Sequence, residues 1–226
     1  MATGNQPLFK LTNKTLAYGE AYILNDLNLT IRRGERIALI GRSGSGKSTL
    51  LKHLRSLSPE LVTWCPQNPA LVPMFSTFHN IYAGCLSEHS FAYNLLNLIR
   101  PQSKALEVVR DIARSLSIEE YLKTPVEHMS GGQQQRVGLG RALIQKSPVF
   151  LGDEPVSAVD EYQAGELIRL ISREYQTSVI ALHDVSLALE YATRVVGLSE
   201  GRIWLDVDVS TASSEQIAAL YTEADE

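Results

Sequence analysis

The chain has 226 residues, a formal net charge of −4 at pH 7 and an apolar content of 44%. This length suits one α/β domain, and the apolar content is ordinary for a globular protein. No apolar run approaches the roughly 20 residues that a membrane helix needs, the first ten residues do not resemble a signal peptide, and scattered Lys and Arg in an acidic chain argue against a nucleic-acid partner.

The first part of the chain predicts three strands and a helix. Residues 8–18 and 24–31 alternate apolar and polar side chains, as strands half covered by a core do. Residues 35–41 form a short apolar run that predicts a buried strand, and residues 47–57 repeat apolar side chains with helical spacing. A loop rich in glycine and serine therefore lies between a strand and a helix.

The middle of the chain predicts helices. Helical spacing of apolar residues extends from about residue 76 to residue 146, and residues 103–116 form the clearest amphipathic segment. This stretch predicts a helical lobe.

Strand patterns return in the last third of the chain. Residues 148–153 and 177–183 are apolar runs bounded by polar residues, which predicts buried strands of a parallel sheet on either side of a helix at 160–175. Residues 194–207 predict two short strands around a turn at Glu200. Because strands and helices alternate around a helical insertion, we expect an α/β sheet with an inserted helical lobe.

The two cysteines, Cys65 and Cys85, raise the question of a zinc site, since His79 and His89 are near them in sequence. Their spacing is not that of paired C-x-x-C zinc ligands. Two free thiols in a reducing compartment are the favoured interpretation.

The sequence GRSGSGKST matches the phosphate-binding motif G-x-x-x-x-G-K-[ST] in the context that the motif requires, between a predicted strand and a predicted helix. Its backbone N–H groups and the helix dipole favour phosphate. Lys47 is expected to reach the β- and γ-phosphates, and Ser48 to ligate Mg²⁺. The alternative is a glycine-rich turn that binds nothing, which the complete motif disfavours. The expected ATP-binding residues are Gly41, Arg42, Ser43, Gly44, Ser45, Gly46, Lys47, Ser48 and Thr49.

Such a loop needs a carboxylate near the magnesium ion, and the predicted strand at 148–153 ends in Asp153. Asp153 is expected to hold Mg²⁺ through water, and Glu154 to act as the general base on the attacking water. The alternative for this pair is a solvated acidic turn. His183 ends the next predicted strand, where ligands of parallel sheets bind, so contact with the γ-phosphate competes with a purely structural role.

The stretch EHMSGGQQQRVGLGRAL begins at Glu127 and enters a predicted helix. Ser130 followed three residues later by Gln133 predicts a capping box. The same helix N-terminus can also bind an anion.

Taken together, GRSGSGKST, Gln67, MSGGQQQR, FLGDEP, SAVD and His183 occur in the order seen in the nucleotide-binding subunits of ABC transporters, so almost the entire chain resembles this family. The resemblance implies a P-loop NTPase fold of ABC type, with N-terminal antiparallel strands and a mainly parallel core. It also implies a single ATPase domain, with residues 1–66 and 147–226 forming the core and about 67–146 the helical subdomain. The short distance between Lys47 and Gln67 implies a shortened β-subdomain.

The resemblance assigns roles that the residues alone do not give. In that family two subunits face head to tail, and the signature loop of one contacts the γ-phosphate bound by the other. Gln67 then belongs to the catalytic and Mg²⁺-binding residues, and Tyr18 stacks on adenine, although an ordinary strand-end tyrosine is a serious competitor. The residues assigned to the ATP of the partner subunit are Ser130, Gly131, Gly132, Gln133 and Asp160.

Residues 80–98, the break at 100–101 and residues 181–206 resemble the phosphonate-importer subgroup, as does the lack of a C-terminal regulatory domain. This resemblance implies a homodimeric, ATP-hydrolysing subunit, peripheral on the cytoplasmic face of the inner or plasma membrane. It would drive separate transmembrane permease subunits, supplied by a solute-binding protein.

Three alternatives stay open at this point. Phosphate, phosphite and polar amino-acid importers share the ATPase motifs. A soluble ABC ATPase acting on DNA, ribosomes or cofactor assembly is disfavoured because no coiled-coil arm, second cassette or basic stretch is visible in the sequence. A non-catalytic nucleotide-dependent dimer is disfavoured because Lys47, Asp153, Glu154 and His183 are all present.

Overall fold

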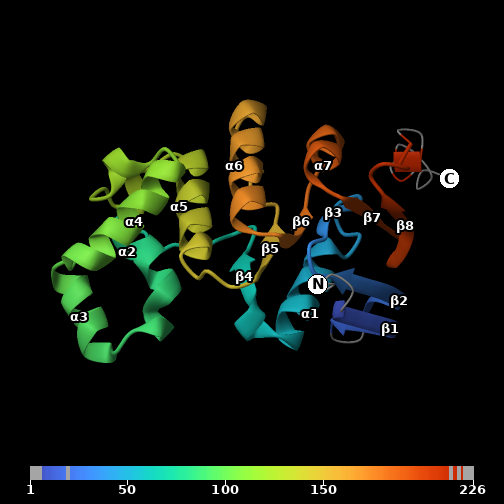
Figure 1. The fold of residues 1–226 in the computed structure, drawn as a ribbon, viewed down its shortest axis with the longest axis horizontal. Helices are drawn as coiled ribbons and strands as arrows, with labels where there is room; N and C mark the ends of the chain where they lie inside the picture. Colours follow the sequence, from blue (N-terminus) through green and yellow to red (C-terminus); the bar gives the residue numbers. More distant parts are fainter. Residues whose placement is uncertain (1–6, 19–20, 214–215, 218–219, 221–226) are drawn as a thin grey trace, which may run out of the picture.

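A central six-stranded sheet organises the molecule (Figure 1). The computed structural model describes residues 7–18, 21–213, 216–217 and 220. The strand order is β4-β5-β6-β3-β7-β8, with β8 alone antiparallel to its neighbour. The strands are Arg36–Ile40 (β3), Val62–Cys65 (β4), Val149–Asp153 (β5), Thr177–Ala181 (β6), Arg194–Ser199 (β7) and Arg202–Asp208 (β8).

Strand β3 shows why the parallel strands read as continuous apolar runs. Ile37 and Leu39 pack into the core cluster on one face of the sheet, whereas Ala38 and Ile40 pack into the cluster on the other face. A strand covered on both faces needs apolar side chains at every position. The predictions of buried strands at 35–41, 148–153 and 177–183 are confirmed within two residues at each end.

Helices cover both faces of the sheet. Helix α1 (Lys47–Leu57) contributes to the same cluster as Ile37, whereas α6 (Glu161–Glu174) contributes to the opposite cluster. Figure 1 shows α1 below the sheet, and α6 and α7 (Val185–Tyr191) above it. The bounds of α1 match the predicted helix at 47–57.

The N-terminal strands form a separate antiparallel sheet. Strands β1 (Pro7–Tyr18) and β2 (Ala21–Arg32) pair only with each other in the described part of the chain. The inward residues of β2 are Leu24, Leu27, Leu29 and Ile31, and they join the cluster that also contains α1. The two predicted strands at 8–18 and 24–31 are confirmed, and so is the antiparallel N-terminal part of the fold.

Strand β4 was not predicted. It follows α1 after one short 3-10 turn, Pro59–Leu61, and pairs with β5 at the edge of the central sheet. The chain therefore passes directly from α1 into the central sheet, which accounts for the short distance between Lys47 and Gln67. No third strand joins β1 and β2 in the described residues.

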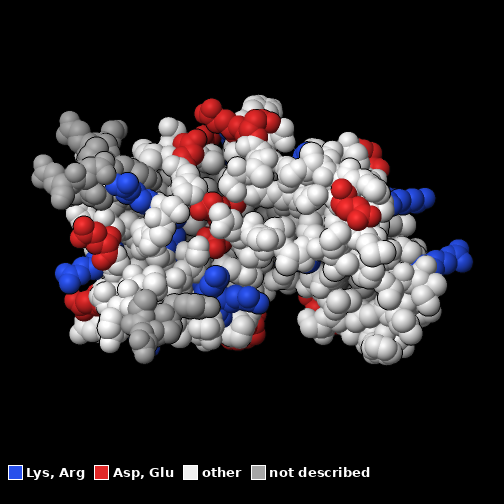
Figure 2. All heavy atoms as spheres, turned by 180° about the vertical axis from the view of Figure 1, so that it is seen from behind, with Lys and Arg blue, Asp and Glu red and all other residues white. Residues whose placement is uncertain are grey.

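A helical lobe lies beside the sheet, on the left in Figure 1. The sequence predicted helices from about 76 to 146, and the structure breaks this stretch into four α-helices. A 3-10 turn at Ala83–Glu88 follows the first of them, and two more, at Glu119–Tyr121 and Val126–His128, precede the last. Seen from behind, a hollow separates the lower part of the lobe from the sheet (Figure 2). The lobe helices are α2 (Thr77–Tyr82), α3 (Phe91–Ile99), α4 (Ser103–Ser115) and α5 (Gly131–Leu143).

Helix α3 is oriented against the usual rule, since its only fully buried residue is polar. Asn97 is 0% exposed and donates through Nδ2 to Tyr82 Oη and to the Tyr93 carbonyl. The apolar residues of α3 face outward, with Phe91 82% and Ile99 78% exposed. An exposed apolar helix face of this kind marks an interaction surface. We call this surface the α3 face, which consists of Phe91, Leu95, Leu96, Leu98 and Ile99.

No helix among the described residues is long and apolar enough to cross a membrane.

Candidate functional site

The GRSGSGKST loop connects the carboxyl end of β3 to the first turn of α1. Its shape depends on glycine at two positions. Gly41 has φ +140, and a Cβ there would lie 2.3 Å from the Leu198 carbonyl oxygen. Gly46 has φ +103, and a Cβ there would lie 2.5 Å from the Leu24 side chain. Any larger residue would clash or be strained at both places, so this sequence folds the loop tightly over the helix N-terminus.

Two buried side chains of the loop fit a phosphate ligand. Lys47 Nζ donates to the carbonyls of Gly41 at 2.7 Å and Arg42 at 3.1 Å, which fixes the ammonium group inside the loop. Burial lowers the pKa of Lys47, while the carboxylates of Glu154 and Asp153 act in the opposite direction. Ser45 Oγ is buried with no hydrogen-bond partner among the described residues. A buried hydroxyl without a partner is unusual and fits a site built to donate to an anion.

Ser48 and Asp153 meet at the same place. Ser48 Oγ donates to Asp153 Oδ1 at 2.9 Å, and Asp153 is 4% exposed. Burial raises the pKa of Asp153, the Ser48 hydrogen bond lowers it, and the nearby Glu154 raises it. A hydroxyl beside a carboxylate is a pair of hard oxygen donors, which is the chemistry that Mg²⁺ prefers. The two residues therefore fit the predicted magnesium site.

Glu154 is held from both sides. Gln67 Nε2 donates to Glu154 Oε2 at 3.0 Å, and His183 Nε2 lies 2.5 Å from Glu154 Oε1. Gln67 follows β4, Glu154 follows β5 and His183 follows β6, and these strands are neighbours in the sheet. The carboxyl ends of parallel strands meet at one end of the sheet, so three residues far apart in sequence share one cluster. We call this region, with the loop after β3, the carboxyl end of the sheet.

Ser130 and Gln133 form the predicted capping box at the start of α5. Ser130 Oγ accepts from Gln133 N at 3.3 Å, and Gln133 Oε1 accepts from Ser130 N at 2.8 Å. Ser130 and Gly131 are exposed. No hydrogen bond within the described chain joins residues 130–133 to the GRSGSGKST loop. The structure thus brings Lys47, Ser48, Gln67, Asp153, Glu154 and His183 together and leaves the signature residues apart from them.

Two predicted residues lie elsewhere. Asp160 caps α6, where Oδ1 accepts from Gln163 N at 2.9 Å, and it is exposed. Tyr18 ends β1, and its side chain lies outside the part of the chain that the structure describes.

Gln135 was not singled out from the sequence, although it contacts this site. Its side chain is 9% exposed and donates to the backbone carbonyl of Glu154 at 3.1 Å. The sequence gives no signal for it, because it is the last of three identical glutamines and only the helix orientation tells which one is buried.

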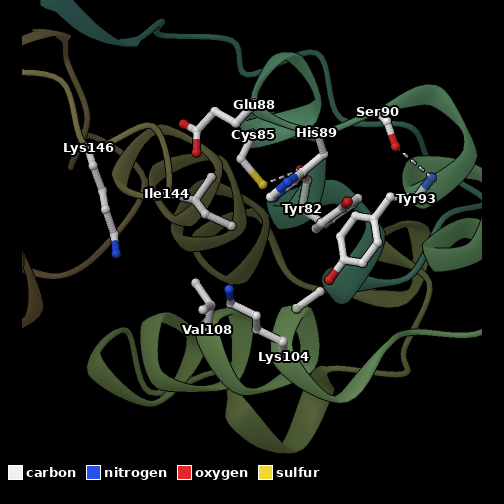
Figure 3. Close-up of a pocket in the computed structure, with 11 residues that line it drawn as sticks. Tyr82, Cys85, Glu88, His89, Ser90, Tyr93, Lys104, Val108, Ile144 and Lys146 are labelled. Atoms are coloured by element: carbon white, nitrogen blue, oxygen red, sulfur yellow. Dashed lines mark hydrogen bonds between the residues drawn. The ribbon is translucent and has the colours of Figure 1, made fainter.

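A separate hollow of about 530 Å³ lies within the lobe (Figure 3). Tyr82, His89 and Tyr93 form one wall, with Lys104 and Lys146 on other sides. None of the predicted nucleotide-site residues lines it. The buried Cys85 also lines it, and Cys65 is likewise a buried free thiol. Burial raises the pKa of Cys85 to about 11 and that of Cys65 to about 12, so neither is a ready nucleophile or metal ligand.

The ABC transporter family matches residues 24–60 and 55–157. The two segments meet at 55–60, where the chain passes from α1 to β4 without the usual β-subdomain strands. The match extends over more than half of the chain. This protein therefore belongs to the ABC transporter family as an ATP-binding cassette, and it is an ATPase.

Relatives with curated names are similar to this chain over most of its length. The chain is 33% identical to the phosphonates import ATP-binding protein PhnC of Pseudomonas putida, over 97% of this chain and 91% of that protein. It is 31% identical to the protein of the same name from Bacillus cereus, over 88% of each chain.

Solved structures agree on the fold. The dimeric structure of a bacterial ABC transporter cassette matches with a TM-score of 0.76 at 24% identity, over 88% of this chain and 98% of that chain. A nucleotide-free ATP-binding cassette from an ABC transporter matches with a TM-score of 0.74 at 20% identity, over 94% of each chain. The predicted ABC-type fold, with its antiparallel N-terminal strands, is confirmed.

Proposed function

We propose that this protein is the ATPase subunit of an importer for phosphonate or a related phosphorus oxyanion. The observation that carries the proposal is the similarity to phosphonate import ATP-binding proteins over nearly the whole chain. The contacts of Ser48 with Asp153, and of Gln67 and His183 with Glu154, support it. We take the chain as one ATPase domain, with residues 1–66 and 147–226 as its core and about 67–146 as its helical subdomain.

The proposed binding roles follow from the positions of the side chains. The backbone of residues 41–49 and Lys47 hold the phosphates of ATP, because a tight glycine-dependent loop and a buried ammonium group lie together at the start of α1. Ser48 and Asp153, with Gln67, hold Mg²⁺, which supplies charge neutralisation at the β- and γ-phosphates when it is bound. Tyr18 stacks on the adenine.

The proposed catalytic base is Glu154, and two neighbours orient it. The carboxylate accepts a proton from the attacking water as that water approaches the γ-phosphate. His183 and Gln67 each contact one of its two oxygens, which fixes the plane of the carboxylate before the water arrives. Preorganised contacts of this kind reduce the rearrangement that the reaction requires.

The proposed active form is a homodimer with head-to-tail subunits. Ser130, Gly131, Gly132 and Gln133 stand at an exposed helix N-terminus that makes no hydrogen bond to the phosphate loop of its own described chain. Such a terminus binds anions, so it is available for the γ-phosphate held by a second subunit. Asp160 lies at another exposed helix start and links the two sites across the interface.

The proposed partners are transmembrane permease subunits, which place the protein on the cytoplasmic face of the membrane and connect it indirectly to a solute-binding protein. The α3 face supports a docking partner because it exposes five large apolar side chains. Figure 2 shows mostly uncharged residues over this lower part of the lobe. Phe91→Ser with Ile99→Ser should keep ATP binding and lose co-purification with the permease.

Growth on a phosphonate as the sole phosphorus source tests the transported substrate. Deletion of the protein should abolish growth on phosphonate, wild type should restore it, and Lys47→Ala should not. Loss of growth on phosphate, phosphite or a polar amino acid instead would assign a different importer. Unchanged growth on every solute, with no permease co-purified, would favour a non-transport ATPase.

A further inference from the structure

Gln135 lies in α5, the helix that begins at the signature residues, and connects it to the segment that carries Glu154, the proposed base. Its Nε2 donates to the backbone carbonyl of Glu154 at 3.1 Å and to Ser157 Oγ at 3.2 Å. Its Oε1 accepts from the backbone N–H of Ala158 at 2.7 Å. One buried amide therefore makes three hydrogen bonds to the turn at residues 154–158.

That turn needs to be fixed, because Glu154 has an unfavourable backbone conformation. Its φ is +53, the left-handed region that residues other than glycine rarely adopt. Such conformations persist only where surrounding contacts hold them, and they gather at functional sites. The Glu154 carbonyl accepts from Gln135 and from Ser157 Oγ at 3.2 Å, so these contacts hold the residue from its backbone side. Gln67 and His183 hold it from the carboxylate side.

Helix α5 is packed so closely against the same loops that it cannot shift without moving them. A Cβ at Gly132 would lie 2.9 Å from the Ala158 carbonyl oxygen, and one at Gly138 would lie 2.5 Å from Pro69. Pro69 belongs to the loop that carries Gln67. The start of α5 is Ser130, which is exposed and makes no hydrogen bond to the nucleotide loop of its own described chain. A displacement of α5 therefore reaches Glu154 directly through Gln135.

We propose that Gln135 is a positioning residue that sets the Glu154 carboxylate for hydrolysis according to the position of the signature helix. The proposal rests on the proposed role of Glu154. Gln135 touches neither the nucleotide nor the reacting water. When the partner's ATP holds α5 in place, the hydrogen bonds of Gln135 hold the turn that carries Glu154 of the same subunit in the position for hydrolysis. The two sites of the dimer are then coupled within each subunit as well as across the interface.

Gln135→Met tests the proposal, because methionine keeps the length and volume of the side chain and removes all three hydrogen bonds. We expect kcat to fall about 10- to 100-fold, since a misplacement of about 1 Å can have this effect on a catalytic group. ATP affinity should stay close to that of wild type. Gln134→Met is the matched control, since within the described residues the neighbouring amide donates to the carbonyls of Val126 and Met129 and not to the turn at residues 154–158. The kcat of this control should stay close to wild type. A wild-type kcat for Gln135→Met would overturn the proposal, as would an equal loss in both variants.

A double variant separates positioning from a general structural role. If Gln135 acts through Glu154, then Gln135→Met should not slow the residual hydrolysis of Glu154→Gln any further, because residues that act as a unit are not additive. A further loss by the same factor as in wild type would contradict the proposal. Wild-type turnover in Glu154→Gln alone would instead refute the role of Glu154, a distinct result. If Gln135→Met does not fold by circular dichroism, Gln135→Glu replaces it with the same expectations, because the carboxylate keeps the acceptor for Ala158 N–H and loses both donors.

Discussion

The carboxyl end of the sheet and the lobe differ in what holds them together. Strands β5 and β6 are buried at every position, and the side chains at their ends are fixed by that packing. The lobe is specified in good part by buried amides. Asn80 is 1% exposed, accepts from Val72 N at 2.8 Å, and donates to the carbonyls of Val72, Phe75 and Ser76. Asn97 has a similar role inside α3.

This difference matches the proposed division of work. Catalysis needs groups held in one geometry by rigid elements, which a sheet buried on both faces provides. Partner contacts need an accessible apolar surface, and the α3 face has one because the buried Asn97 lies on the inner side of that helix. Gln135 is an amide of the lobe whose hydrogen bonds reach the turn after β5. The predictions that follow act on one region or the other.

The largest expected effect is at the carboxyl end of the sheet. Glu154→Gln should keep ATP binding and slow hydrolysis by roughly 10²–10⁴-fold, the usual contribution of a positioned base. The amide fills the same space, so ATP should accumulate in a stable dimer. Steady-state turnover and size-exclusion chromatography with ATP measure both effects. Rapid turnover together with a monomer would show that another group activates the water.

Replacing Tyr18 tests how much of the affinity for ATP depends on the proposed adenine contact in a cassette with a shortened β-subdomain. Tyr18→Ala should weaken ATP binding by about 1–3 kcal/mol if base–aromatic stacking applies, and wild type should discriminate weakly between ATP and GTP because stacking accepts any base. Titration of both nucleotides against both proteins measures this. A strong preference for ATP that survives the substitution would assign adenine recognition to another part of the chain.

In the lobe, Asn80→Ala should destabilise the fold by about 1–3 kcal/mol, because buried backbone groups at residues 72–76 lose their partners. For a chain of this length, each kcal/mol corresponds to roughly 2–4 °C in Tm. Asn68→Ala is the matched control, since its exposed side chain makes one hydrogen bond within the described structure, accepted from Ala70 N at 2.9 Å. Equal melting temperatures for Asn80→Ala and wild type would show that apolar packing alone holds the lobe.

The smallest expected effect is a pH dependence of the free energy of unfolding that arises from His53 in α1. Burial, and then the charge of Lys14, lowers the pKa of His53 below its ordinary value of 6.5. As the pH falls below 6.5, the unfolded chain binds a proton that the folded histidine resists, so the free energy of unfolding falls with pH. His53→Gln should remove this loss and behave like wild type at pH 8. Parallel slopes of Tm against pH in both proteins would contradict the shift.

Much of the sheet could be predicted because its strands are continuous apolar runs that end in polar residues. Helix Lys47–Leu57 was predicted to the residue, since the loop motif fixes its start. Strand β4 was missed because four residues, one of them Trp64, show no alternation and directly precede a proline. The contact between Gln67, Glu154 and His183 depends on the strand order β4-β5-β6, which a single sequence does not specify.

The lobe was harder to predict in detail. Its helical pattern was visible, but α3 reverses the usual orientation, so the spacing of its apolar residues does not indicate which side of the helix is buried. Tertiary hydrogen bonds to Asn97 decide that orientation, and no periodicity encodes them. Gln135 was missed for the same reason, because tertiary contacts, and not its position in a run of three glutamines, decide which of the three is buried.

The central claim is that the signature residues of the lobe serve the nucleotide of the partner subunit, while the carboxyl end of the sheet serves its own. Mixing Lys47→Ala with Ser130→Ala tests this most directly. Each variant alone should lack turnover, and Ser130→Ala should still bind ATP as a monomer. The mixture should regain ATP hydrolysis, because mixed dimers contain one site with an intact Lys47 from one subunit and an intact Ser130 from the other. A mixture as inactive as its components, or a Ser130→Ala monomer that no longer binds ATP, would contradict the account.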